Sequence, residues 1–104
     1  MDLLSETLLS ASELRSKEIE VLGKPAIVRE PRAGVLKKYA EAVGRDIEEA
    51  NGLLIAACLL NPDGTPAVNA QQASKVAQNG RVALPIVTAI LEVSGFIEKE
   101  PDAG

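Results

Sequence analysis

A strict alternation of apolar and polar residues near the N-terminus constrains the fold of this chain more than any other feature. Residues 17–22 alternate in this way around Ile19 and Val21, residues 25–30 form a second short run that contains Ile27 and Val28, and Gly23 and Lys24 separate the two runs. Alternation along the chain is the pattern of a strand that buries one face, and a glycine-containing pair between two such runs is typical of a hairpin. The sequence therefore predicts an antiparallel β-hairpin over residues 17–30.

The register of this hairpin depends on where its turn lies. A turn centred on the glycine-lysine pair sets Ile19 opposite Val28 and Val21 opposite Ala26. These four apolar side chains then share one face of the hairpin. Because a lone hairpin is barely stable in water, we expect that face to lie against helices.

The rest of the chain has helical spacing. In the N-terminal segment, Leu4, Leu8 and Ala11 follow the i, i+4, i+7 pattern of one helix face. The expected helices span residues 2–10, 32–43, 46–60, 70–79 and 85–94. The predicted fold class is mainly α, an α+β domain of four to five helices with one N-terminal antiparallel β-hairpin.

Local signals mark where these helices begin. Asp46 and Asn69 are each followed three residues later by a Glu or Gln, which is capping-box spacing, and Pro85 suits the first turn of the last helix. The pair Asn51-Gly52 lies inside the second core helix, where it indicates either a close contact with a neighbouring helix or a break. The side chains expected to face the core are Val35, Leu36, Tyr39 and Val43 in one helix and Ile47, Ala50, Leu54, Ala57 and Cys58 in the next.

The length of 104 residues fits one domain. We expect an N-terminal helix and linker at residues 1–14, the hairpin at residues 17–30, a helical core at residues 32–95, and a mobile polar tail at residues 96–104. The start of the chain lacks a basic region and carries Asp2, so it is not expected to be a signal peptide. No apolar run approaches the ~20 residues of a membrane span.

The charge balance bears on partners and compartment. With 11 basic and 15 acidic residues the net charge is −4, which argues against nucleic acid as a partner because phosphates attract basic surfaces. Cys58 is the single cysteine, so no disulfide can form within one chain, and a reducing cytoplasm is expected.

Residues for catalysis are sparse. The chain has no histidine, which removes Ser-His and Cys-His pairs and the usual zinc sites. The carboxylates of Asp46, Glu48 and Glu49 open a predicted helix, where the helix dipole accounts for them, and Cys58 lies on an apolar helix face. We therefore expect no enzyme activity, no catalytic or metal-binding residues, and no cofactor.

Three stretches together resemble the tail assembly chaperones of long-tailed bacteriophages and prophages. These are "IVREPRAG" before the first core helix, the helix "LLIAACLL", and "NPDGTPAVNAQQASKVA" directly after it. Shared family features fall on Val28-Arg29-Glu30, on residues 53–60, and on Asp63, Gly64 and Pro66. The likeness spans about residues 15–95. It departs at Ala67-Val68, where the family often has a bulky residue.

The resemblance implies a non-enzymatic role. Such proteins bind the long tape-measure protein and keep it soluble while the tail-tube protein polymerises around it, in the cytoplasm of the host bacterium. They leave before the virion is complete, and many are also made in a longer form by a programmed ribosomal frameshift. The alternatives are a structural head–tail connector or tail completion protein, which would remain in the virion, and an enzyme with an unrecognised carboxylate site.

Candidate partner-binding residues lie at the two ends of the predicted core. They are Leu3, Leu4, Leu8 and Leu9 in the N-terminal segment and Phe96 and Ile97 near the C-terminus. Either group can hold a helix of the tape-measure protein or simply cover an edge of the domain. Residues 84–94 are apolar nearly all round, so we also expect self-association.

Overall fold

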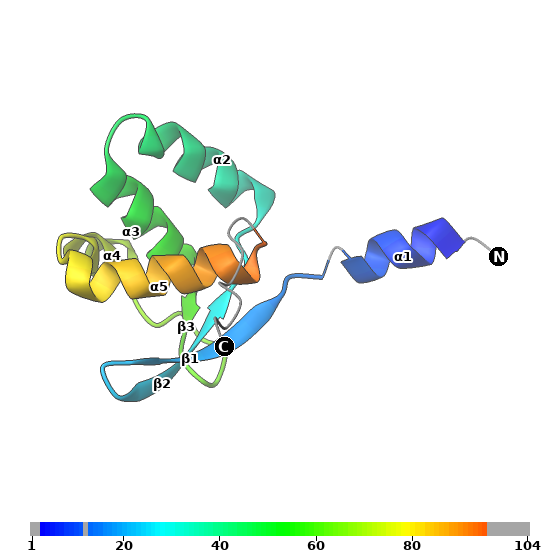
Figure 1. The fold of residues 1–104 in the computed structure, drawn as a ribbon, viewed down its shortest axis with the longest axis horizontal. Coiled ribbons are helices and arrows are strands. Elements are labelled where there is room, and N and C mark those ends of the chain that lie inside the picture. The colour runs from blue at the N-terminus through cyan, green and yellow to red at the C-terminus, as the bar shows by residue number, and fades with distance from the viewer. Residues whose placement is uncertain (1–2, 12, 96–104) are drawn as a thin grey trace, which may run out of the picture.

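The computed structural model describes residues 3–11 and 13–95, which form five helices and three strands (Figure 1). In chain order these are α1 (Leu3–Ala11), β1 (Ser16–Val21), β2 (Lys24–Arg29), α2 (Ala33–Val43), α3 (Ile47–Cys58), β3 (Leu59–Leu60), α4 (Ala70–Ala77) and α5 (Gly80–Val93). The predicted class is confirmed: the chain is mainly helical and carries an antiparallel hairpin near its N-terminus.

The hairpin forms where the alternation predicts it, but the predicted register is wrong. Ile19 lies opposite Ala26 rather than Val28, because the turn consists of Leu22 and Gly23. Both turn residues have positive φ, 51° and 80°, the conformation of the two-residue turn whose twist matches that of paired strands. Leucine seldom adopts this conformation, so its place in the turn was not evident from residue type.

A third strand completes the sheet, and the sequence did not indicate it. The helix predicted to reach residue 60 ends at Cys58, and the chain then extends as β3. Leu59 and Leu60 pair antiparallel with Val28 and Ile27, which makes β2 the central strand. Pairing with a buried strand gives backbone N–H and C=O groups hydrogen-bond partners that they would otherwise lack. Here this pairing outweighs the preference of leucine for a helix.

The starts of α3, α4 and α5 have side-chain caps. Asp46 accepts hydrogen bonds from the backbone amides of Glu48 and Glu49, and Asn69 forms a full capping box with Gln72. The predicted start of the last helix near Pro85 is wrong. Asn79 caps α5, which begins five residues earlier at Gly80, and Pro85 lies within the helix on its exposed side.

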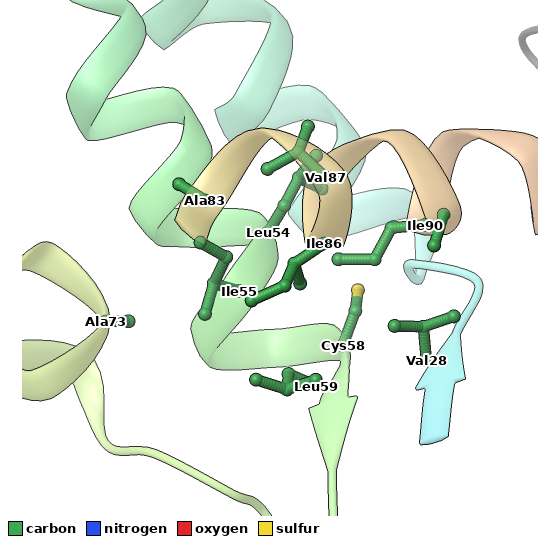
Figure 2. Packing of buried hydrophobic residues seen from close by; sticks show 11 residues of the cluster. Val28, Leu54, Ile55, Cys58, Leu59, Ala73, Ala83, Ile86, Val87 and Ile90 are labelled. Atoms are coloured by element: carbon green, nitrogen blue, oxygen red, sulfur yellow. The ribbon is translucent and has the colours of Figure 1, made fainter. Parts of the chain in front are cut away.

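The core is built between α3, α5 and the central strand (Figure 2). Leu54, Ile55 and Cys58 of α3 lie against Ile90 of α5 and Val28 of β2, and all five are almost fully buried. A side chain on Gly52 would begin 3.5 Å from the Cα atom of Ser74 in α4. The interpretation of this glycine as a close helix contact is therefore confirmed, and α3 runs through it without a break.

The first helix lies apart from this core. Figure 1 shows α1 extending away from the helices and strands of the rest of the chain. The linker returns to the body at Arg15, whose backbone amide donates to Glu30 Oε1 at 3.1 Å and whose guanidinium donates to the carbonyl of Ser94 at 3.0 Å. The chain is thus held at Arg15, directly before β1 begins.

Candidate functional site

An apolar groove of about 780 Å³ runs along α2 and ends against α5. We call it the α2 groove. It is lined by Ala33, Leu36, Lys37, Tyr39, Ala40 and Val43 of α2 and by Leu91 of α5. Lys37 is the one charged residue among them. A concave, mostly apolar surface with a single charge at its side is suited to holding an apolar partner.

The groove exists because α2 buries only one of its two apolar faces. Ala42 is fully buried, and Val35 and Tyr39, on the same side of the helix, are half-buried. Val43, which the sequence analysis placed toward the core, is 45% exposed. Successive residues of a helix are rotated by about 100°, so residues seven apart lie on nearly the same side. Val43 therefore lies with Leu36 on the face next to the buried one.

One expected core residue of the next helix is also exposed. Ala50, Leu54 and Cys58 face the core as predicted, but Ile47 is 54% exposed at the first position of α3. Its predicted burial is wrong, because Asp46 caps the helix there and the first turn projects into solvent.

Of the predicted partner-binding residues, Leu4, Leu8 and Leu9 have described side chains, and none of these three lines the α2 groove. Leu4, Leu8 and Leu9 lie on α1 and are 67%, 59% and 69% exposed. Leu3 begins α1, but its side chain is not among the described parts of the structure, and Phe96 and Ile97 lie outside the described residues altogether. The exposure of the α1 leucines does not fit the interpretation that they cover an edge of the domain.

The α2 groove was not predicted from the sequence. The signal was present, because Leu36, Ala40 and Val43 have the i, i+4, i+7 spacing of a second apolar face. Both Leu36 and Val43 were expected to face the core. Only the packing of α2 on α3 shows that the small residue Ala42 occupies the buried position instead.

The acidic cluster at the start of α3 has a structural role. The side chains of Asp46, Glu48 and Glu49 are all exposed, and Glu49 forms an ion pair of 3.0 Å with Arg45. An acid–base pair would need a carboxylate shielded by apolar groups, so this arrangement counts against a carboxylate active site. Within residues 3–11 and 13–95, no group of acidic, Cys or His residues is placed to hold a metal ion.

The same part of the chain contains no helix with the length and apolar character needed to cross a bilayer. The longest described helix, α5, has 14 residues. A membrane-spanning helix needs about 20.

Cys58 should be nearly inert in the folded protein. Burial raises the pKa of its thiol to about 11, and the positive charge of Arg29 offsets only part of this rise. Because the thiolate is the reactive form, we expect a thiol reagent at neutral pH to label native Cys58 at least about a hundredfold more slowly than the same cysteine in denaturant. The labelling rates would be followed by the absorbance of the chromophore that the thiol reagent releases.

A matched control is a Cys58→Ala, Thr88→Cys variant, which moves the cysteine to an exposed position on α5. This variant should react at the rate of a free thiol both before and after denaturation. Equal rates for native wild-type protein and the control would contradict the burial of Cys58.

Comparison with known proteins identifies a structure with a similar fold. No protein-family model matches the sequence, and no curated protein matches it. The structure is similar to that of the bacteriophage HK97 tail assembly chaperone, with a TM-score of 0.66 and 21% sequence identity. The match covers 93% of this chain and 99% of the HK97 chain.

The chain therefore has the fold of a phage tail assembly chaperone. The structural match confirms, at the level of the fold, the resemblance that the sequence motifs indicate. Because the match covers 93% of this chain and 99% of the HK97 chain, it extends well beyond a single motif.

Proposed function

We propose that this protein is a tail assembly chaperone, which binds the tape-measure protein and keeps it soluble while the tail-tube protein polymerises around it. It acts in the cytoplasm of the host bacterium, is not an enzyme, and leaves before the virion is complete. The observation that carries this proposal is the fold shared with the HK97 chaperone over nearly the full length of both chains.

The α2 groove is the surface that best suits such a client. A tape-measure protein is long and helical, and a helix lays its apolar face into a groove of this kind. Leu36, Tyr39 and Val43 offer apolar contacts at successive turns of α2, and Lys37 lies beside them. Each large apolar side chain covered on binding contributes about 1.5–3 kcal/mol before ordering costs are subtracted. Such a contact holds a client without a covalent step and allows its later release.

Co-expression with the tape-measure protein tests this function. We expect wild-type protein to keep the tape-measure protein in the soluble fraction and to co-purify with it. Val43→Asp places a charge in the α2 groove and should send most of the client to the pellet, whereas Leu22→Asp at the exposed hairpin turn should behave as wild type. Soluble client in the absence of this protein would contradict the proposed function.

The sequence-based candidates for the client contact can be tested in the same assay. Leu4→Asp with Leu8→Asp alters α1, and Phe96→Asp with Ile97→Asp alters the residues after α5. We expect smaller losses of client from both double variants than from Val43→Asp. A larger loss from either of them would move the client surface to that group of residues.

The composition of the finished virion distinguishes a chaperone from a connector or completion protein. A connector or completion protein remains in the virion, whereas a chaperone does not. Mass spectrometry of purified particles should therefore detect the tail-tube and tape-measure proteins without this chain. Its presence at a fixed copy number would favour the connector or completion role.

A further inference from the structure

Two asparagines of this chain are directly followed by glycine. They are Asn51, before Gly52, and Asn79, before Gly80. Asparagine is a thermolabile residue, because the backbone amide nitrogen of the next residue can attack its side-chain carboxamide. Glycine leaves that nitrogen accessible, since it has no Cβ to shield it. The two pairs have the same chemistry, so any difference in their reactivity comes from the fold.

The fold protects the first pair. Asn51 lies inside α3 and is only 6% exposed. In a regular helix the amide of Gly52 donates to the carbonyl four residues earlier, so its nitrogen is held away from the side chain of the preceding residue. Reaction at Asn51 therefore requires that α3 first open locally.

The second pair lies at the junction of α4 and α5, and both of its residues are exposed. Gly80 is the first residue of α5, and the first amides of a helix have no intrahelical partner. The side-chain oxygen of Asn79 accepts a hydrogen bond of 3.1 Å from the backbone amide of Arg81. Negative charge develops on that oxygen when the carboxamide carbon is attacked, so this donor favours the reaction.

We propose that Asn79 is a site of spontaneous deamidation in the folded protein. Hydroxide removes the proton of the Gly80 amide, and the nitrogen forms a bond to Cγ of Asn79. The bond from Cγ to the side-chain nitrogen breaks, and that nitrogen leaves as ammonia after taking a proton from water. The product is a cyclic imide, which a second water molecule opens at either carbonyl to give aspartate or isoaspartate. The nucleophile is held beside its target by the chain itself, which makes the attack intramolecular.

The two products affect the structure differently. Aspartate is also a good N-cap, and its negative charge is favourable at the start of a helix, so this product keeps α5 capped. Isoaspartate carries Cβ into the main chain. Because the carbonyl of Asn79 accepts from the amides of Val82 and Ala83 at 3.0 and 2.9 Å, the lengthened backbone disturbs the first turn of α5. Either product adds one negative charge to the net charge of −4. This inference does not depend on the proposed client.

Peptide mass spectrometry of the aged full-length protein tests the proposal. Cleavage by trypsin places the two pairs on separate peptides, residues 46–75 and residues 76–81. In native protein at mildly alkaline pH, Asn79 should convert at least about tenfold faster than Asn51, because only the latter depends on opening of a helix. In denaturant the two rates should become similar. A zero-time sample corrects for conversion during digestion.

Asn69 is a matched control within the same molecule. It is exposed and caps α4, and its side chain accepts from the amide of Gln72 at 2.8 Å, but Ala70 follows it. It should convert at least about fivefold more slowly than Asn79, because the alanine side chain shields the attacking nitrogen. Native Asn79 that converts no faster than Asn69 or Asn51 would overturn the proposal.

Gly80→Ala gives the corresponding change at the site itself. The added Cβ would lie 3.7 Å from Cδ1 of Leu84, an ordinary contact, so this variant should fold, as circular dichroism would show. Its Asn79 should convert as slowly as Asn69. The control Gly52→Ala should leave the rate at Asn79 unchanged. Conversion of Asn79 at the wild-type rate in folded Gly80→Ala would overturn the proposed attack by the Gly80 nitrogen.

Discussion

Leu54→Ala should lower the free energy of unfolding by about 2–5 kcal/mol, the largest effect expected from a single conservative change in this chain. Leu54 is fully buried in α3 and belongs to the cluster formed with α5 and the central strand. Truncation removes apolar contacts and leaves a cavity, because helices held on several sides cannot close around the gap. The loss would be measured by urea denaturation monitored by circular dichroism.

The control is Leu84→Ala, the same substitution on α5 at a position that is 56% exposed. It should change the free energy of unfolding by less than about 0.5 kcal/mol. For a domain of this size each kcal/mol corresponds to roughly 4–8 °C in the thermal midpoint, so the two variants should separate clearly. Similar losses in both would mean that Leu54 does not occupy the core position described here.

Substitution of Gly52 should lower the stability of the protein when the new side chain is large and should not lower it when the new side chain is a single methyl group. Gly52→Leu should destabilise the protein by about 1–3 kcal/mol, because atoms beyond Cβ would press against the backbone of α4 at Ala73 and Ser74. Gly52→Ala adds only a Cβ at 3.5 Å from the nearest atom, an ordinary contact, and alanine favours the helix by about 1 kcal/mol over glycine. The alanine variant should therefore be as stable as wild type or more stable.

Denaturant midpoints of both variants would measure this difference. The matched control is Gly34→Leu in the first turn of α2, where a Cβ meets nothing within 4 Å. It should be tolerated. If Gly52→Leu is tolerated equally well, α3 and α4 do not approach as closely as the structure indicates.

Local chemistry explains which features the sequence could predict. Caps such as Asp46 and Asn69 are determined within three residues of the chain, and the alternation around residues 17–30 depends only on neighbouring positions. Both features, and with them the fold class, are recognisable without tertiary information. The same local character explains why Pro85 was misleading: it resembles a helix start, but the cap at Asn79 determines where α5 begins.

Features that depend on distant contacts were not predictable in this way. Leu59 and Leu60 form a strand because β2 lies beside them, not because of their own preference. The groove was missed for a related reason. Two apolar faces on α2 are visible in the sequence, but the choice of Ala42 rather than Val43 for the core depends on how closely α2 approaches α3.

Tyr39, on the wall of the α2 groove, gives the molecule an internal optical reporter. The chain has one tyrosine and no tryptophan, so near-ultraviolet emission of the native protein comes from this single ring. A partner helix bound in the groove would replace solvent around Tyr39, and a helix without tyrosine or tryptophan would add no second emitter. Occupancy of the groove by such a partner can thus be followed without a label, in the unmodified protein, by the intensity and anisotropy of one side chain.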